Sequence, residues 1–351
     1  MKKSLWTRFT VLWDRSKRNW KGRILIFFAF LILFLGGIYL IGPRVETPVL
    51  SPEMPKVPQN LEALAAYVEA KEAAVENIKP NNQSVLIFHD SLPKKTDYSV
   101  LYYHGFTASP IEGDPVHKDI AQALGANLFV PRLYGHGLEE DEPMLNFHND
   151  PYWESAKEAL AVAKALGEQV IVLATSHGAT LALSLGQDPQ VAAVALYSPN
   201  IRLADPAAVV LSKPWGLQLA RLVKGGNYHE MDRLTEAKKK YWTYITRLES
   251  GAHLQKFLEM KMKPETFQNF TKPLFLGYYY KDETHKDEVV SIPALLDMYE
   301  QLGTPDSLKQ KVVFPEAGEH VMTSYLSTTQ YDKVTQETLG FLNRILQLDE
   351  N

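Results

Sequence analysis

The sequence predicts an α/β fold, with a mainly parallel sheet flanked by helices, a helical lid insertion, and one transmembrane helix before the domain. Three observations lead to this prediction. An uncharged apolar run lies near the N-terminus, short apolar segments alternate with helical ones from about residue 85, and the interval 200–271 interrupts that alternation. Apolar strands separated by helices are typical of a parallel sheet that is buried on both faces.

Composition is that of a folded protein and excludes several functions. The 351 residues are 45% hydrophobic and 22% charged, which suits one large domain plus an appendage. The formal net charge is −4 and no basic stripe follows the N-terminal segment, so we expect no nucleic-acid partner. The chain has no cysteine, which excludes a disulfide scaffold, a thiolate metal site and a cysteine nucleophile.

Residues 24–41 read ILIFFAFLILFLGGIYLI and carry no charge. At about 1.5 Å per residue, this run nearly spans a hydrocarbon layer of about 30 Å, so we expect a transmembrane helix over residues 24–42. A cleaved signal peptide is the alternative. The apolar region of a signal peptide is normally shorter than this run, follows a shorter basic start and precedes a small-residue cleavage site. These differences favour an uncleaved anchor.

The charges around this run predict its orientation. Eight Lys or Arg residues and a single acid, Asp14, precede it, whereas Arg44 and Glu46 follow it. By the positive-inside rule, residues 1–23 form a basic cytoplasmic leader and the rest of the chain lies outside the cytoplasm. In a bacterium with two membranes, a single-pass anchor in the inner membrane would hold the domain on the periplasmic side.

A linker and a helix are expected between the anchor and the sheet. Five prolines between residues 43 and 58 favour an extended linker over residues 43–60 that holds the domain off the membrane. Apolar residues at helical spacing from Leu61 to Ile78 predict a short amphipathic helix packed on the domain, rather than a partner-binding stalk. The domain itself is expected to cover residues 61–351.

The pattern beyond residue 85 predicts strands that alternate with helices. The strands are expected at 85–88, 99–103, 128–130, 170–173, 192–196, 274–279 and 312–314, and the helices at 115–124, 152–166, 179–186 and 334–346. The interval 200–271, the insertion, is rich in Trp, Tyr and Leu and has no clear strand. We expect it to be helical and to cover the carboxyl ends of the strands, where such sheets place their sites.

The clearest functional signal is Ala174-Thr175-Ser176-His177-Gly178, which follows a predicted strand and begins a helix. This pattern is a nucleophile elbow, G-x-S-x-G in its usual form, with Ala174 in place of the first glycine. The tight turn needs small flanking residues, exposes the Ser176 hydroxyl and directs a helix N-terminus towards it. The alternative is an ordinary strand-to-helix turn in which Ser176 is only the helix cap.

Upstream, a predicted strand ends in His104-Gly105-Phe106, and here the sequence resembles the α/β-hydrolase superfamily. The resemblance implies that the backbone N–H groups of Phe106 and His177 form an oxyanion hole, whereas the His104 side chain braces the loop. Residues 131–137, PRLYGHG, are similar to a structural segment of monoacylglycerol-lipase-like and carboxylesterase-like members. To the intervening loop 108–113 we assign no chemistry.

Downstream, the loop after the last predicted strand contains Gly318-Glu319-His320-Val321. The superfamily carries its general base here, often as Gly-His followed by an aliphatic residue, so the intervening Glu319 is a small departure. The resemblance implies that His320 is the base that activates Ser176. A surface or core histidine without catalytic role is the alternative.

Two acids compete for the third position of the triad. Counting from the start of the strand at residue 274 favours Asp282, whereas Asp287 precedes Val289-Val290-Ser291 and reproduces the acid-x-Val-Val pattern of the family. We favour Asp287. The carboxylate would hold the His320 imidazole in the correct tautomer and stabilise its protonated form.

Together these residues predict a serine hydrolase that cleaves carboxylic esters, with a small-molecule or lipid-derived ester as substrate. Amide, peptide or thioester hydrolysis by the same triad and a catalytically silent binding module are the alternatives. We expect no metal or cofactor, because the sequence has no H-E-x-x-H, Walker or G-x-G-x-x-G motif in the required context. Apolar residues of the insertion could form an acyl pocket or simply bury its helices: Trp215, Leu217, Leu219, Leu222, Tyr241 and Trp242.

Overall fold

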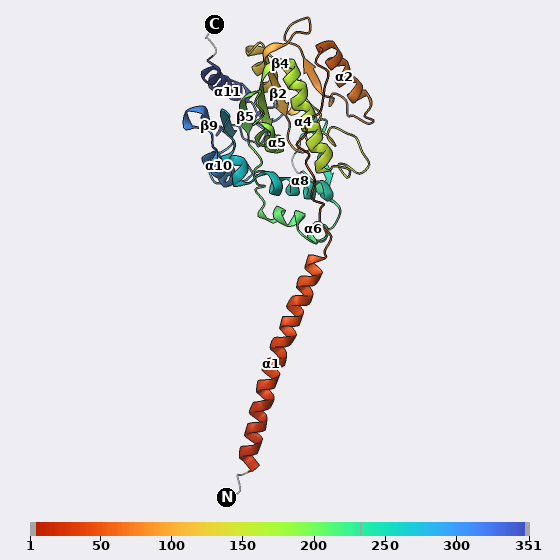
Figure 1. Cartoon of the computed structure of the whole chain (residues 1–351), viewed down its shortest axis with the longest axis vertical. Helices are drawn as coiled ribbons and strands as arrows, with labels where there is room; N and C mark the ends of the chain where they lie inside the picture. The colour runs from red at the N-terminus through yellow and green to blue at the C-terminus, as the bar shows by residue number, and fades with distance from the viewer. Residues whose placement is uncertain (1–4, 232–233, 348–351) are drawn as a thin grey trace.

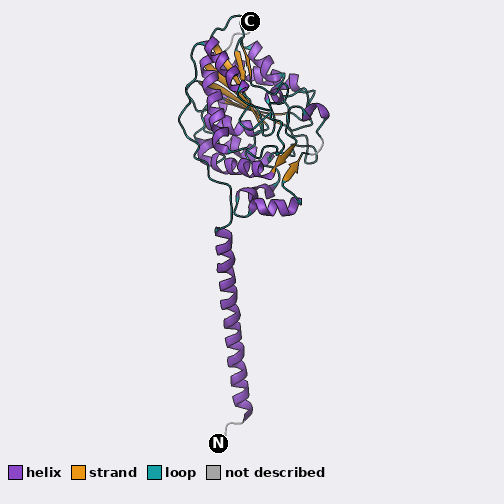
Figure 2. Cartoon of the chain, turned by 90° about the vertical axis from the view of Figure 1, so that its right-hand side faces the viewer, coloured by secondary structure: helices purple, strands orange, loops and turns teal. Residues whose placement is uncertain are grey.

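The computed structural model describes residues 5–347 except 232–233. A long helix, α1 (Leu5–Leu40), projects from a domain that contains the other helices and strands (Figure 1). Most of the strands lie in the interior of this domain with helices on both sides (Figure 2). The last described helix, α11 (Tyr331–Leu346), lies at the end of the domain farthest from α1 (Figure 1).

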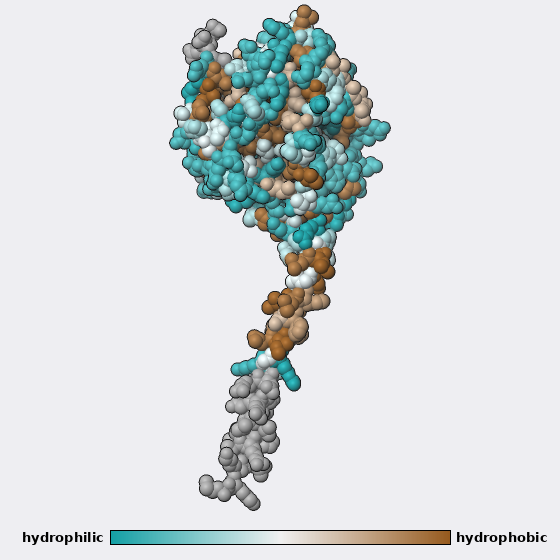
Figure 3. Space-filling view, viewed as in Figure 1, coloured by the Kyte–Doolittle hydropathy of each residue, from teal (hydrophilic) through white to brown (hydrophobic). Residues whose placement is uncertain are grey.

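Within the described residues, one helical segment, Trp20–Leu40 of α1, is long and apolar enough to cross a membrane. It is not buried inside the domain. Most of its surface is hydrophobic, whereas most of the visible domain surface is hydrophilic (Figure 3). The predicted N-terminal apolar helix is therefore present.

Seven strands form one sheet in the order β1-β3-β2-β4-β5-β8-β9. Their bounds are β1 (Val85–Ile87), β2 (Thr96–Tyr103), β3 (Asn127–Val130), β4 (Gly167–Thr175), β5 (Val191–Tyr197), β8 (Leu274–Tyr278) and β9 (Lys309–Val313). The edge strand β1 is antiparallel to β3, and all other neighbours are parallel. Each predicted strand overlaps one of these seven, so the expected mainly parallel sheet is confirmed.

Helices cover both faces of the sheet because alternate strand residues point to opposite sides. In β2, Leu101 and Tyr103 belong to one core, and Val100 and Tyr102 to the other. The first core includes side chains from α4 (Asn149–Leu166), α5 (His177–Leu185) and α10 (Ile292–Gln301). The second includes side chains from α3 (Val116–Ala123) and α11 (Tyr331–Leu346).

The insertion lies between β5 and β8 and, in space, between the sheet and α1 (Figure 1). Its elements are the short 3-10 helix η2 (Pro206–Ser212), α6 (Gly216–Lys224), β6 (Tyr228–Glu230), α7 (Glu236–Lys239), β7 (Ile245–Arg247), α8 (Leu248–Lys261) and α9 (Pro264–Gln268). The expectation that it contains no strand is wrong, because β6 and β7 form an antiparallel pair. Each has three residues and β6 is exposed throughout, so neither produces a recognisable apolar pattern.

The segment from Pro43 to Pro58 contains no described helix or strand, yet it is attached to the domain. The N–H groups of Val49 and Leu50 donate to the Asp150 carboxylate at 2.8 and 3.1 Å. The Trp153 indole N–H donates to the Ser51 carbonyl at 2.7 Å. The segment thus follows the surface of α4 rather than acting as a free spacer.

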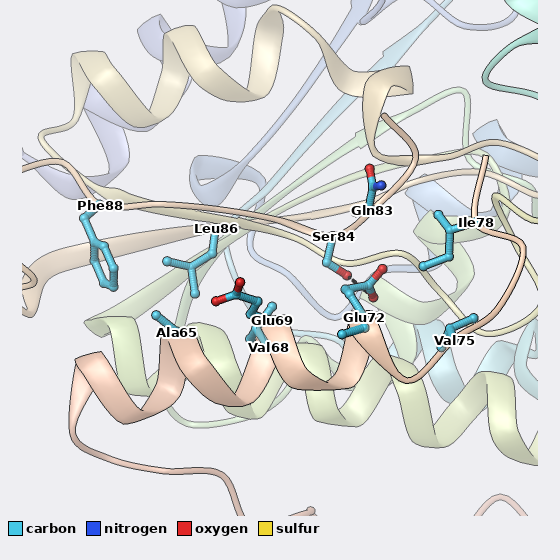
Figure 4. Close-up of a pocket in the computed structure, with 11 residues that line it drawn as sticks. Ala65, Val68, Glu69, Glu72, Val75, Ile78, Gln83, Ser84, Leu86 and Phe88 are labelled. Carbon is cyan, nitrogen blue, oxygen red and sulfur yellow. Dashed lines mark hydrogen bonds between the residues drawn. The ribbon is translucent and has the colours of Figure 1, made fainter. Parts of the chain in front are cut away.

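Helix α2 (Leu61–Ala73) begins at Asn60, whose side chain accepts from the Ala63 N–H at 2.8 Å, and it ends before the predicted limit at Ile78. A groove of about 590 Å³ lies between α2 and β1 (Figure 4). Its lining includes Val68, Glu72 and Leu86, and none of the predicted site residues.

Candidate active site

Ser176 occupies a sharp turn between β4 and α5. Its backbone angles, φ 54° and ψ −118°, are strained for a residue with a side chain, and such strain is typical of a nucleophile elbow. The turn is held by the Ser176 N–H, which donates to the Tyr197 carbonyl at 3.0 Å. At Gly178, an added Cβ would lie 2.2 Å from the Tyr103 carbonyl oxygen, so only glycine fits there.

His320 and Asp287 form a close pair. The Nδ1 atom of His320 lies 2.6 Å from Oδ2 of Asp287, which has a fully buried side chain. The other carboxylate oxygen accepts from the N–H groups of Val289 and Val290 at 2.9 and 3.1 Å. Burial alone would raise the pKa of Asp287, but His320 and these N–H donors hold that pKa below its ordinary value. Asp287 is therefore ionised at neutral pH.

Asp282 lies in a different environment. Its side chain is exposed and accepts from Thr284 and from His285, whose N–H donates at 2.9 Å. Of the two acids considered from sequence, only Asp287 hydrogen-bonds to His320. The Val289 and Val290 N–H groups explain this difference, because their bonds hold the Asp287 carboxylate towards the interior.

The second ring nitrogen of His320 is available for chemistry. Among the described residues, no side chain or backbone group hydrogen-bonds to its buried Nε2 atom. Burial alone would lower the pKa of the His320 imidazole, but Asp287, with help from Glu112 and Glu319, holds that pKa above its ordinary value. A free Nε2 and a raised pKa suit a group that accepts a proton during reaction.

Tyr102 connects the loops that carry Ser176 and His320. Its hydroxyl group lies 2.7 Å from Oγ1 of Thr175 and 3.1 Å from Oγ1 of Thr323. Thr175 immediately precedes Ser176, and Thr323 follows His320 by three residues. This buried network fixes the end of β4 against the histidine loop, and thus brings the predicted nucleophile and base to the same edge of the sheet.

The two predicted oxyanion donors flank Ser176. His177 is the first residue of α5, where backbone N–H groups lack partners within the helix. Phe106 follows Gly105 in the chain, and the backbone at Gly105 lies close to Ser176. A Cβ added at Gly105 would lie 3.1 Å from the Ser176 Cβ. No hydrogen bond joins the Phe106 N–H to another residue in the described part of the chain. Both N–H groups remain available to a ligand.

The side chain of His104 braces the loop before Phe106. Its Nδ1 atom lies 2.9 Å from the Gly105 carbonyl, and its Nε2 atom accepts from the Leu133 N–H at 3.1 Å. One ring nitrogen therefore donates and the other accepts, which is the arrangement of a neutral imidazole. Burial keeps the pKa of His104 well below its ordinary value, so it stays neutral. This contact links the His-Gly motif to the segment 131–137.

Aromatic rings pack against Phe106 and His177, the two residues whose N–H groups are the predicted oxyanion donors. The Phe106 ring meets the rings of His136 and Phe147 edge to face, at 5.8 and 5.2 Å between centroids. Tyr152 stacks on His177 at 5.4 Å. Burial lowers the pKa of His177 to about 3, so no charged imidazole lies beside the predicted oxyanion position at neutral pH.

Glu112, to which the sequence assigned no chemistry, is a buried carboxyl group beside the candidate nucleophile. Its Oε2 atom accepts from the Gly105 N–H at 2.7 Å and from the Tyr102 hydroxyl at 3.1 Å. Burial raises the pKa of Glu112 to about 7, although the Gly105 N–H, His320, Tyr102 and Lys238 favour its ionised form. The only sequence signal is an acid in the otherwise uncharged loop after the His-Gly motif.

We expect Glu112→Gln to reduce the dependence of thermal stability on pH. Because the folded state raises the pKa of this carboxyl from 4.5 to about 7, the folded protein binds more protons than the unfolded chain between these values. The wild-type protein therefore loses stability as pH rises through this range, by at most about 3 kcal/mol. Glutamine still accepts from the Gly105 N–H but cannot ionise.

The measurement is the melting temperature of both proteins between about pH 5 and pH 8. The fall with rising pH should be smaller in the variant. The exposed Glu316, which pairs with Lys281, provides the control substitution Glu316→Gln, whose curve should parallel the wild type. Parallel curves for Glu112→Gln would show that this carboxyl does not titrate in the folded protein.

The insertion contacts three of the loops that carry predicted site residues. The Thr243 N–H donates to the Thr107 carbonyl at 2.8 Å, and Thr107 directly follows Phe106. Lys238 forms an ion pair with Glu319, next to His320. Ala204 N–H donates to the Val289 carbonyl at 2.9 Å, in the loop of Asp287. The insertion therefore closes over the carboxyl ends of the strands, as expected.

The apolar residues of the insertion differ in how far they are exposed to solvent. Trp242 is buried against Ala108 and Val321. In contrast, Trp215, Leu219 and Leu222 are 37%, 49% and 79% exposed. For these three, neither an acyl pocket nor simple burial on the core describes the structure, because α6 and the residue before it present them to the outside of the domain.

The family of the chain follows from its sequence as well as its fold. A family model described as the alpha/beta hydrolase family matches residues 100–328, which is more than half of the chain and includes Ser176, Asp287 and His320. The chain therefore belongs to the alpha/beta hydrolase family. A comparison with curated proteins found no match.

Solved structures share this fold. One described with the metagenome-derived lipolytic enzymes LipS and LipT has a TM-score of 0.60 at 17% identity, over 76% of this chain and 100% of that chain. The monoacylglycerol lipase of Paleococcus ferrophilus has a TM-score of 0.54 at 13% identity, over 75% and 98%. A soluble variant of monoglyceride lipase from Saccharomyces cerevisiae has a TM-score of 0.54 at 13% identity, over 75% and 90%. At these identities the likeness shows the fold alone.

Proposed function

We propose that the chain is a membrane-anchored serine hydrolase that cleaves carboxylic esters. The observation that carries this proposal is the pairing of His320 with Asp287 on a loop that Tyr102 ties to the strained turn at Ser176. Family membership and the descriptions of the structural neighbours as lipases support the same reaction class.

In the proposed first step, Nε2 of His320 takes the proton from the Ser176 hydroxyl, and Oγ attacks the carbonyl carbon of the ester. The carbonyl oxygen becomes an oxyanion that accepts from the N–H groups of Phe106 and His177. Each such donor is worth about 3–4 kcal/mol in a site fixed before reaction. Asp287 stabilises the imidazolium without taking its proton.

The tetrahedral intermediate then collapses and the bond to the alcohol oxygen breaks. His320 gives its proton to the departing alcohol, which leaves an acyl group on Ser176. A water molecule, deprotonated by His320, attacks this acyl-enzyme and releases the carboxylic acid. The proton returns to Ser176, so the enzyme is regenerated and one water is consumed for each ester.

The apolar helix near the N-terminus supports a lipid-derived ester as substrate, since an anchored enzyme meets amphiphilic esters at the membrane surface. The test is to offer the full chain, in detergent, p-nitrophenyl esters of increasing acyl length together with matched anilide and thioester compounds. We expect ester hydrolysis to be fastest. Faster anilide cleavage would contradict the ester assignment, and no reaction with any acyl compound would contradict an enzymatic role.

The excess of basic residues before the apolar run 24–41 supports a topology in which the N-terminus is cytoplasmic and the domain lies on the periplasmic side of the inner membrane. A fusion of alkaline phosphatase to the C-terminus should therefore be active, because that reporter needs an oxidising compartment. Activity of a cytoplasmic reporter at the same position, with no phosphatase activity, would overturn the orientation.

A further inference from the structure

Helix α6 carries an apolar face whose side chains are largely exposed. The face consists of Leu219, Leu222 and Val223, with Trp215 directly before the helix, and we call it the α6 face. The spacing of these residues places them on one side of a helix. Leu222 and Val223 are 79% and 83% exposed, and a contiguous exposed apolar surface marks a binding surface.

The α6 face lies beside the end of the anchor helix. The indole N–H of Trp215 donates to the Ile38 carbonyl at 2.9 Å, and the Trp215 backbone N–H donates to the Pro43 carbonyl at 2.9 Å. The indole also lies directly on Gly42, where an added Cβ would be 2.2 Å from Nε1. Figures 1 and 3 show the lower end of the domain in contact with the hydrophobic helix.

These contacts complete the C-terminus of α1. The last carbonyl groups of a helix have no partner within it. The Ile38 carbonyl receives the Trp215 indole, and the Leu40 carbonyl receives the Arg44 guanidinium at 2.7 Å. Trp215 belongs to the insertion, whereas Arg44 belongs to the linker, so the indole bond fixes the insertion against the anchor, rather than leaving the two parts joined only through the linker.

This geometry determines the depth of α6 relative to a bilayer. Ile38 belongs to the segment Trp20–Leu40 that is long enough to span the membrane, so a side chain bonded to its carbonyl lies at the boundary of the hydrocarbon layer. Tryptophan is enriched at that boundary. On the other side of α6, Arg221 bonds to Glu249 of α8 at 2.5 Å, which directs that side towards the domain. The α6 face is left on the side of the helix that points away from the domain.

From these contacts we infer that the α6 face docks on the lipid bilayer that holds α1, so that the insertion lies on the membrane interface. The inference rests on the proposed anchor. Because the insertion contacts the loops of Thr107, Val289 and Glu319, docking directs the candidate active site towards the bilayer. Esters that partition into the membrane would then reach the site from the lipid side.

The absence of cysteine from the sequence makes the test direct, because one introduced cysteine gives one label. The full chain carrying Leu222→Cys is labelled with an environment-sensitive fluorophore and reconstituted in phosphatidylcholine and phosphatidylglycerol vesicles. The control label is Gln336→Cys, on the exposed side of α11 far from α1 (Figure 1). Lipids with a nitroxide in the upper acyl chain should quench the label at 222 and not the label at 336.

Trp215→Ala, added to the Leu222→Cys chain, should reduce this quenching because it removes the bond to Ile38. Equal, weak quenching at 222 and 336 in vesicle-bound protein would overturn docking. In the unlabelled Leu222→Cys chain, disulfide formation between two copies at position 222 would assign the face to a second copy of the chain instead. Failure to float with vesicles would refute the anchor as well, whereas quenching without ester hydrolysis would refute only the proposed reaction.

Discussion

Replacing Ser176 with alanine is expected to lower kcat/KM for ester hydrolysis by about 10³–10⁶-fold, because no other group can form the acyl-enzyme. The change removes one oxygen from a side chain that is 7% exposed, so the fold should be retained. The measurement is steady-state hydrolysis of a p-nitrophenyl ester, with circular dichroism to verify folding.

Ser184 provides a matched control on the same helix. Its hydroxyl donates to the Thr180 carbonyl at 2.7 Å and contacts none of the predicted site residues. Ser184→Ala should keep activity close to wild type. A Ser176→Ala protein that is folded and retains wild-type hydrolysis would refute the nucleophile, and an equal loss in Ser184→Ala would attribute the effect to the helix rather than to the hydroxyl.

The second large effect is expected at Asp287. In Asp287→Asn the amide keeps one acceptor for the Val289 and Val290 N–H groups but no longer provides a carboxylate for His320. The wrong imidazole tautomer and an unstabilised imidazolium should lower kcat by about 10²–10⁴-fold. Asp282→Asn should stay within about twofold of wild type, because its exposed side chain bonds to His285 and lies outside the pair.

The pH profile separates this electrostatic role from a purely structural one. Activity requires neutral His320, whose pKa lies above 6.5 because Asp287 outweighs the opposing effect of burial. In wild type, kcat/KM should therefore rise with pH through a value above 6.5. Without the carboxylate, burial dominates, the pKa of His320 falls, and the residual activity should rise at lower pH. An unchanged profile, or a larger loss in Asp282→Asn, would contradict the assignment.

Local patterns were sufficient to predict the sheet and the turn at Ser176. Each central strand is a continuous apolar run, and the elbow requires small residues at fixed offsets. A few consecutive residues are therefore enough to recognise either feature. The same holds for the loop of His320, which follows the last strand. The short strands β6 and β7 left no such pattern, since no apolar side chains alternate in β6.

The acid and its surroundings could not be predicted with the same certainty, because they depend on contacts across the fold. Asp282 and Asp287 lie five positions apart in one loop, and only the direction of each carboxylate distinguishes them. Tyr102 and Glu112 acquire their environment from Thr175 and Thr323, which are distant in sequence. The orientation of Trp215 likewise depends on the end of α1, to which no local pattern in the insertion points.

If His320 activates Ser176 as a nucleophile, a mechanism-based probe should react at Ser176 and depend on the imidazole. The full chain is treated with a fluorophosphonate at neutral pH, digested and analysed by mass spectrometry to locate the phosphonylated residue. We expect one adduct, on Ser176, formed much more slowly in His320→Ala. An adduct on a different residue, or no adduct on the folded protein, would contradict it.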